Sequence, residues 1–170
     1  MRRRQRPRIQ FVVDSREQLA YRFYSPARGD LDPAIPLTVI EGLHEGDYSA
    51  RLVTDEGGVL LPVRVERKSL GDLYGVCGYG RDRFERELVR LAGYPRAYLV
   101  IEAELRQVLA GFERSRISGR AVLTSVASWA QKFGVAPIFA GDRRLARAWT
   151  QRVLEEAAAD AAMDCGRSAR

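Results

Sequence analysis

The residues with the most evident chemistry are an acid and a base in one short segment, Glu66-Arg67-Lys68, with Asp47 before it and Asp72 after it. In an extended strand alternate side chains share a face, so Glu66 and Lys68 are predicted to point one way and Arg67 the other. Two carboxylates that strands bring together form an oxygen site suited to Mg²⁺, which binds through one or two carboxylates together with water and substrate phosphate. Lys68 adds a positive charge beside them. The spacing therefore predicts the site of a metal-dependent nuclease.

Lys68 also stands out in the composition. All but two of the 28 basic residues are arginines, and the two lysines are Lys68 and Lys132. A lysine is a compact charge whose pKa shifts readily, whereas an arginine is not deprotonated in proteins. That one of the two lysines falls beside Glu66 favours a chemical role for it.

The composition is that of a globular protein. The 170 residues fit one domain, which would bury roughly 70% of the surface that its unfolded chain exposes. With 46% hydrophobic and 29% charged residues, and no apolar run near the length of a membrane span, we expect no membrane partner. The basic N-terminus lacks the apolar stretch of a signal peptide, so we expect an intracellular protein of the cytoplasm or nucleoid. Cys77 and Cys165 lack metal-type spacing, which argues against a zinc site.

The net charge of +6 is concentrated in an N-terminal arm, residues 1–8, that contains five arginines. Without these residues the remaining body carries only about +1, so the arm would provide most of any long-range attraction to a polyanion. Two interpretations are open, a DNA-contacting arm and a disordered, solubilising tail.

Strands and helices are expected to alternate around the acid–base segment. Apolar runs predict strands at 9–13, 37–41, 48–53, 59–66, 96–102 and 136–140. Apolar residues at helical spacing, with capping residues before them, predict helices from 70 onward and at 82–92, 104–110, 122–133 and 142–160. The stripes of three of these helices are Phe84, Leu88 and Leu91; Val122, Val126, Trp129 and Phe133; and Leu145, Trp149 and Val153.

A hairpin is predicted to bring the two main carboxylates together. The Gly-rich turn at 55–58 joins two strands, with Asp47 at the start of the first and Glu66 at the end of the second. Pro62 cannot donate to a central ladder, so an alternative start for the second strand is Val63.

Several ordered motifs at compatible spacings carry a resemblance to a known family. They are Val13-Asp14-Ser15-Arg16-Glu17, Gly46-Asp47-Tyr48, Val65-Glu66-Arg67-Lys68-Ser69 with Asp72, Gly80-Arg81, and the later passage Phe133 to Phe139. Over residues 9–158 the sequence resembles the ERCC4-type nuclease domain of the XPF/MUS81/Hef structure-specific endonucleases. The resemblance implies a restriction-endonuclease-like α/β/α sandwich with a mixed central sheet at 9–160, between the arm at 1–8 and a flexible tail at 161–170.

The resemblance also implies Mg²⁺- or Mn²⁺-dependent cleavage of DNA. Asp47 and Glu66 would be metal ligands, and the Arg67 backbone carbonyl would supply a further oxygen. Asp14 would contribute to the metal site from the end of the neighbouring strand. Lys68 would orient or polarise the attacking water. Asp72 is expected to fix Lys68 or Arg67 in place. Simpler roles stay open for two of these residues, since Asp14 could end its strand and Asp72 could interact with a helix N-terminus.

Contacts to DNA are expected from Arg16, Arg81 and Arg83, with Glu17 in the same set, because guanidinium groups suit phosphate. The resemblance further implies a homodimer through the nuclease domain and a branched, flapped or nicked DNA substrate. Two alternatives are a non-catalytic DNA-binding or scaffolding module, and a nuclease of the same fold with relaxed or junction-resolving specificity.

Overall fold

The computed structural model describes residues 8–24, 37–54 and 57–168, so the predicted arm lies outside the described residues except for Arg8. Its strands form one seven-stranded sheet in the order β2-β1-β3-β5-β6-β7, with β4 paired to β3 off this path. The strands are β1 (Arg8–Asp14), β2 (Thr38–Glu41), β3 (Tyr48–Thr54), β4 (Gly57–Leu60), β5 (Val63–Ser69), β6 (Arg96–Glu102) and β7 (Ala136–Phe139). The helices are α1 (Leu70–Cys77), α2 (Arg81–Leu91), α3 (Leu105–Ala110), α4 (Gly119–Phe133) and α5 (Arg143–Ser168).

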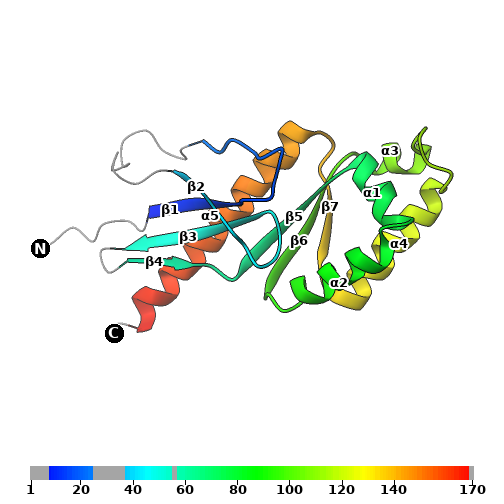
Figure 1. The fold of residues 1–170 in the computed structure, drawn as a ribbon. Helices are drawn as coiled ribbons and strands as arrows, with labels where there is room; N and C mark the ends of the chain where they lie inside the picture. The colour runs from blue at the N-terminus through cyan, green and yellow to red at the C-terminus, as the bar shows by residue number, and fades with distance from the viewer. Residues whose placement is uncertain (1–7, 25–36, 55–56, 169–170) are drawn as a thin grey trace, which may run out of the picture.

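The sheet is mixed and lies between two helical layers. β3 runs antiparallel to β1, β4 and β5, whereas the β1–β2, β5–β6 and β6–β7 pairs are parallel. Figure 1 shows α5 along one face of the sheet and α1, α2 and α4 gathered at the other. This arrangement confirms the predicted α/β/α sandwich with a mixed central sheet. No helix in the described part of the chain is long and apolar enough to cross a membrane.

Each face of the sheet covers its own hydrophobic core. The core under α5 includes Phe11, Tyr48, Val65, Val100 and Leu154. The core under α1, α2 and α4 includes Leu73, Phe84, Leu88, Leu99 and Trp129. Since strand side chains alternate between faces, the residues next to Val65 on β5 point toward the second core. The predicted stripes of α2 and α4 are confirmed, because their apolar residues are buried there or pack against that core.

The predicted strand at 59–66 is in fact two strands. β4 ends at Leu60 and β5 begins at Val63, so the ladder is interrupted at Leu61-Pro62. Proline has no N–H to donate and is confined to the edges and starts of strands. Val63, the alternative start, is thus the correct one.

The stripe predicted for the last helix is displaced by one residue. The residues of α5 that are completely buried are Ala146, Thr150 and Leu154, while Leu145 is about half exposed. Small side chains at Ala146 and Thr150 let the helix approach the sheet closely. A prediction based on large apolar residues does not include such positions. Trp149 and Val153 pack at the edge of the same core.

Helix α5 continues to Ser168, beyond the predicted helix end at 160. Alanine has the highest helix propensity, and Ala161 and Ala162 pack against the core under α5. The helix therefore has both a local and a tertiary reason to extend beyond Asp160.

Candidate active site

Asp47 and Glu66 meet where β3 begins and β5 ends. The Asp47 N–H donates to the Val65 carbonyl at 2.8 Å, and Asp47 Oδ2 accepts a hydrogen bond from the Arg67 N–H at 2.7 Å. Tyr48 and Val65 are the paired residues of the two strands at this point. The register predicted from the hairpin is confirmed, because the two carboxylates lie at the same end of the sheet.

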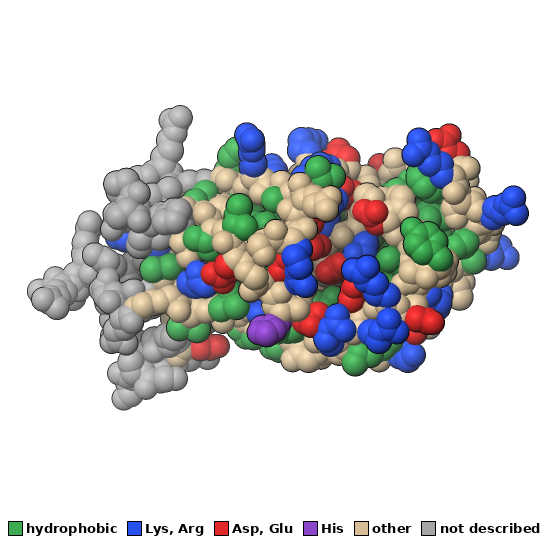
Figure 2. Space-filling model, viewed as in Figure 1, with side chains coloured by type: hydrophobic (Ala, Val, Ile, Leu, Met, Phe, Trp, Pro, Cys, Tyr) green, Lys and Arg blue, Asp and Glu red, His purple; other side chains and the backbone are tan. Residues whose placement is uncertain are grey.

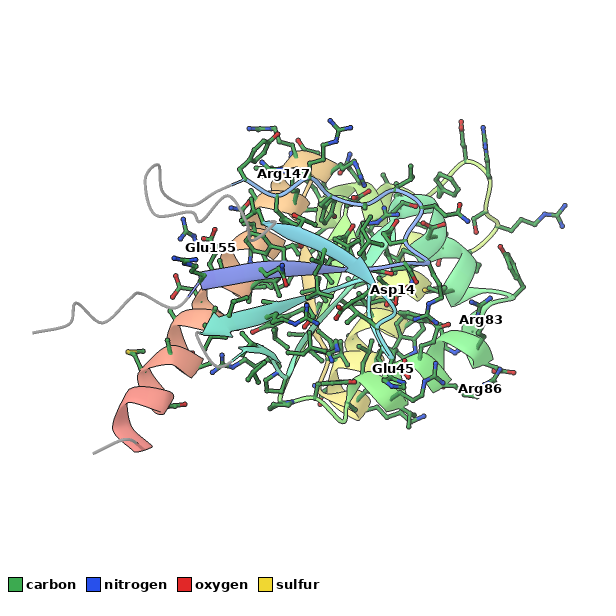
Figure 3. All side chains as sticks on the ribbon, turned by 60° about the vertical axis from the view of Figure 1, so that its left-hand side comes forward. Asp14, Glu45, Arg83, Arg86, Arg147 and Glu155 are labelled. Atoms are coloured by element: carbon green, nitrogen blue, oxygen red, sulfur yellow. The ribbon has the colours of Figure 1, made fainter. Side chains whose placement is uncertain are left out.

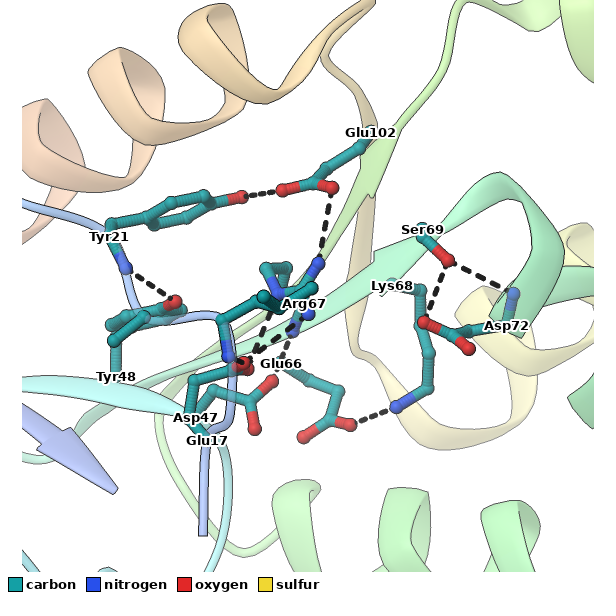
Figure 4. A network of polar contacts seen from close by, with 12 residues as sticks. Glu17, Tyr21, Asp47, Tyr48, Glu66, Arg67, Lys68, Ser69, Asp72 and Glu102 are labelled. Atoms are coloured by element: carbon teal, nitrogen blue, oxygen red, sulfur yellow. Dashed lines mark hydrogen bonds and ion pairs between the residues drawn. The ribbon is translucent and has the colours of Figure 1, made fainter. Parts of the chain in front are cut away.

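Lys68 lies on the same face as Glu66 and forms an ion pair with it (Figure 4). Both side chains are largely buried. The Lys68 ammonium also lies 4.8 Å from the centre of the Phe84 ring on α2, an attractive cation–π arrangement. The position of Lys68 is therefore fixed by a strand, a carboxylate and an aromatic ring together.

These side chains open into a cleft of about 480 Å³. Its walls come from the end of β1, the loop before β3, the end of β5, and helices α1 and α2. Residues predicted for the site that line it are Asp14, Arg16, Glu17, Asp47, Glu66, Arg67, Lys68, Asp72 and Arg83. His44, which is exposed, lines it as well. Figure 2 shows basic side chains surrounding acidic ones on the face that includes α2.

Negative charge in the cleft exceeds what Lys68 neutralises. Burial and the neighbouring Glu66 carboxylate together raise the pKa of Asp47 to about 7. Burial likewise raises the pKa of Glu66, although the Lys68 ammonium opposes this effect. Burial alone would lower the pKa of Lys68, but the Glu66 and Asp47 carboxylates outweigh it and raise that pKa. Lys68 is therefore a cation at neutral pH, where Asp47 is only partly ionised, and deprotonation of both carboxylates leaves a negative charge that Lys68 alone does not balance.

The oxygen atoms available here fit a divalent cation. Asp47 Oδ2 and Glu66 Oε1 accept hydrogen bonds, which leaves Oδ1 and Oε2 without such partners among the described residues. The N–H and C=O of a strand residue point to the same side of the strand. Because the Arg67 N–H donates to Asp47, which directly precedes β3, the Arg67 carbonyl is on the Asp47 side of β5 as well. Hard cations such as Mg²⁺ take oxygen ligands of this kind.

Asp14 is placed near this pair but is bound elsewhere. Its Oδ1 accepts from Arg16 N and Nε at 2.8 Å, and its Oδ2 accepts from Arg16 Nη2 and from the Leu43 N–H. Burial tends to raise the pKa of Asp14, but the bonds from Arg16 and Leu43 give a net lowering. The described residues contain no group of three or more Asp, Glu, His or Cys side chains arranged to hold a metal. The structure therefore joins Asp14 to Arg16 rather than to the Asp47–Glu66 pair.

The Arg67 side chain points to the opposite face, as the strand alternation predicts. It is 9% exposed and forms ion pairs with Glu17 at 3.2 Å and Glu102 at 3.1 Å (Figure 4). The Tyr21 hydroxyl donates to Glu102 at 2.8 Å, and Arg143 of α5 pairs with Glu102 as well. Glu17, predicted in the DNA-contacting set, thus has its carboxylate inside the protein with 6% of the side chain exposed.

Asp72 is held by Ser69 and not by the residues predicted for it. Its carboxylate accepts from the Ser69 hydroxyl at 2.7 Å, and the Ser69 hydroxyl accepts from the Asp72 N–H at 3.1 Å. These bonds cap the N-terminus of α1, where a carboxylate also interacts favourably with the helix dipole. The simpler role that the sequence left open for Asp72 is the one that the structure displays.

The predicted DNA-contacting arginines differ in exposure. Arg16 and Arg83 are exposed at the rim of the cleft, and Figure 3 shows Arg83 projecting outward from α2. Arg81 instead lies over the Trp129 ring and donates to Ser125 at 2.8 Å. Arg90 also lines the cleft and pairs with Glu45. It follows Arg83 by seven residues, about two helical turns, and so lies on the same face of α2.

A pH-dependent stability difference should follow from the burial of Asp47. Its ordinary pKa is 3.8 and its folded value about 7, so the stability it contributes is present below about pH 4 and is lost as the pH rises toward 7. Asp47→Asn avoids that loss, and the amide oxygen can still accept the Arg67 N–H. In EDTA at pH 8 the variant should be more stable than the wild type by at least about 1.4 kcal/mol, which raises Tm by roughly 3–6 °C.

Thermal unfolding between pH 4 and 8 measures this difference. Added Mg²⁺ should raise the Tm of the wild type and leave the variant unchanged, because a ligand stabilises the state that binds it. A difference in Tm that is the same at pH 4 and at pH 8 would contradict the assignment.

Comparison with known proteins identifies similar domains. The family model of the ERCC4 domain matches residues 13–153. The structure is similar to XPF from Aeropyrum pernix, with a TM-score of 0.54, 23% identity, and coverage of 88% of this chain and 63% of that one. It is also similar to XPF from Aeropyrum pernix in a complex with DNA, with a TM-score of 0.55, 22% identity, and coverage of 94% and 66%. The chain thus spans slightly less than two thirds of the length of these proteins. No curated protein matches the sequence significantly.

Proposed function

Because the chain belongs to the ERCC4 domain family, we propose that it hydrolyses DNA phosphodiester bonds in a reaction that depends on Mg²⁺ or Mn²⁺. The observation that carries the proposal is the convergence of Asp47, Glu66 and Lys68 on one face at the end of the sheet, inside a cleft. A buried pair of carboxylates with only one ammonium is costly to maintain. A divalent cation bound by the two carboxylates would balance their charge, and it could then take part in the hydrolysis.

Asp47 and Glu66 would hold the metal with their free carboxylate oxygens, together with the Arg67 backbone carbonyl. The chemistry that the cation supplies when bound is a lowered pKa for water and neutralisation of phosphate charge. The Asp47–Arg67 hydrogen bond keeps the Asp47 carboxylate at a fixed distance from β5. Asp14 would act indirectly, by fixing Arg16 at the rim of the cleft.

Lys68 would act as a fixed cation. The Glu66 and Asp47 carboxylates raise its pKa, which favours the charged ammonium over a neutral general base. Its ammonium can donate hydrogen bonds to the attacking water and to a phosphate oxygen, which stabilises the charge that develops in the transition state. The hydrogen bond that Lys68 donates to Glu66, together with the Phe84 ring, holds the ammonium in place before DNA arrives.

The substrate would be DNA with a branch, flap or nick. Arg16 and Arg83 lie at the rim of the cleft, where guanidinium groups can contact phosphates without reading sequence. One of the similar XPF structures is a complex with DNA, which supports DNA as the partner. Homodimerisation stays a prediction.

A non-catalytic DNA-binding or scaffolding module is the main alternative. Such a module would have no need for two buried carboxylates beside a buried lysine, because binding phosphates requires positive charge alone. The contacts among Asp47, Glu66 and Lys68 therefore favour catalysis. A nuclease with relaxed or junction-resolving specificity would use the same residues, and the choice of substrate distinguishes it.

Cleavage of a set of DNA substrates tests the proposal. Purified protein is incubated with flap, fork, four-way junction and linear duplex DNA in Mg²⁺, Mn²⁺ or EDTA. We expect cleavage of at least one branched substrate in Mg²⁺ or Mn²⁺ and none in EDTA. Binding of DNA without cleavage in either metal would instead support the scaffolding alternative, and equal cleavage of linear duplex would support relaxed specificity.

A further inference from the structure

A second groove leads away from the catalytic cleft between α1 and α2. Its volume is about 290 Å³, and it shares Lys68, Asp72, Arg83 and Glu87 with the cleft. Glycines form much of its remaining wall, at positions 71, 75 and 80. Because glycine has no side chain, the backbone itself forms part of this wall. The groove is therefore continuous with the site where a phosphodiester would be cleaved.

Tyr79 lies at this groove with its side chain unused by the fold. It is 100% exposed, and in the described part of the chain no ring or cation contact involves it. A Cβ added at Gly75 would stand 3.4 Å from the Tyr79 hydroxyl, so the ring extends back along α1 toward the groove. An aromatic ring held in water beside a cleft offers a face on which another ring can stack.

Charged side chains of both signs line the groove. The carboxylates of Asp72, which is exposed, and Glu87 can accept hydrogen bonds from the amino groups of bases. Arg83 pairs with Glu87 and has 83% of its side chain exposed. A base in the groove could thus meet the carboxylates while its phosphate meets Arg83.

A basic loop adjoins the outer end of the groove. A Cβ added at Gly78 would stand 3.0 Å from the Ile117 side chain, so the loop that precedes α4 lies against the end of α1. Three exposed arginines on this loop and the first turn of α4 form no ion pair with any described residue: Arg114, Arg116 and Arg120. A strand that passes Tyr79 would meet this positive charge next.

We propose that the groove binds an unstacked nucleobase from a single-stranded DNA segment that leaves the catalytic cleft, with Tyr79 as its stacking platform. This inference rests on the proposed function and adds to the cleft a binding site for one unpaired nucleotide of the DNA. The groove is smaller than most sites for small ligands, which span roughly 300–1,000 Å³, so it admits one base and excludes a duplex. If this surface instead bound a second copy of the chain or a peptide, changes to it would not affect the binding of unpaired and paired DNA differently.

Equilibrium binding in EDTA tests the proposal without requiring cleavage. The probes are a fluorescein-labelled fork with single-stranded arms and a fully paired duplex of the same length. Tyr79→Ala should weaken binding of the fork by roughly 10- to 100-fold, since stacking on an aromatic side chain contributes that much per base. Binding of the duplex should not change. Tyr79→Trp should bind the fork at least as tightly as the wild type.

Two further variants separate the groove from a general surface effect. Gly75→Leu places a side chain in the groove and against the Tyr79 ring, and leucine is a better helix former than glycine. It should weaken binding of the fork as Tyr79→Ala does. Tyr24→Ala is the matched control, because Tyr24 is also exposed but lies against Arg147 of α5, and it should bind both probes normally.

Fork binding by Tyr79→Ala and Gly75→Leu at the wild-type level would overturn the proposal, as would the same loss of binding for fork and duplex. Failure of the wild type to bind either probe would overturn it too. Failure of the proposed function would give a different result. Tyr79→Ala would still weaken binding of the fork and not of the duplex in EDTA, but the wild type would cleave no DNA in any metal.

Discussion

Lys68→Met is expected to lower the single-turnover rate of DNA cleavage by roughly 10²- to 10³-fold, the usual cost of removing one fixed group that stabilises transition-state charge. Methionine has nearly the length of lysine and can keep its place against the Phe84 ring. The variant therefore removes the ammonium with little change in packing. Because Lys68 is buried in the cleft and not at its rim, DNA affinity should fall much less than the rate.

The second lysine of the chain provides the matched control for this variant. Lys132 is exposed, on α4, and pairs only loosely with Glu85 at 3.8 Å. Lys132→Met should cleave DNA at the wild-type rate. If Lys68→Met cleaves as fast as Lys132→Met in the same single-turnover assay, Lys68 has no catalytic role and the site assignment is wrong.

Arg67→Met should cause a large loss of stability. It leaves the Glu17 carboxylate buried without its cationic partner, while Glu102 retains Tyr21 and Arg143. Removing one partner of a buried ion pair costs about 3–5 kcal/mol, and for a chain of this size a loss of 3 kcal/mol lowers Tm by roughly 6–12 °C.

Chemical denaturation of two further variants tests the reason for that loss. Arg83→Met breaks an ion pair of similar geometry at the surface and should change stability by less than about 1 kcal/mol. Adding Glu17→Gln to Arg67→Met should recover part of the stability, because it removes the unpaired charge. Equal losses for Arg67→Met and Arg83→Met would show that the buried network does not stabilise the fold.

The parts of the site that lie on one hairpin could be predicted from the sequence. Strand alternation put Glu66 and Lys68 on one face and Arg67 on the other, and the turn at 55–58 brought Asp47 to Glu66. Both arguments use local periodicity and short connections, which are the most reliable signals in a sequence.

The partners of the charged side chains could not be predicted in the same way. Glu17 and Glu102 reach Arg67 from segments far away in the sequence, so the pairing depends on sheet order and not on spacing. The sequence predicts that Asp14 contributes to the metal site and that Asp72 fixes Lys68 or Arg67. Instead each carboxylate accepts a hydrogen bond from a neighbour in the chain, Asp14 from Arg16 and Asp72 from Ser69. Short-range hydrogen bonds of this kind compete with long-range ones for the same carboxylate.

Helix α5 shows a different limit. Among its described residues the buried ones are Ala146, Thr150, Leu154, Ala157 and Ala158, and only Leu154 is a large apolar residue. A pattern of large apolar residues predicted the neighbouring face, because close packing against a sheet selects small side chains that carry little hydrophobic signal.

The central claim is that Asp47 and Glu66 hold the metal ion with which this chain cleaves DNA. The most direct test is single-turnover cleavage of a forked DNA by the wild type and by Asp47→Asn across a Mg²⁺ titration. The wild type should show cleavage that saturates with Mg²⁺ and stops in EDTA, while Asp47→Asn, although folded and more stable in EDTA, should not cleave at any Mg²⁺ concentration. Cleavage by Asp47→Asn with the rate and Mg²⁺ dependence of the wild type would contradict the claim.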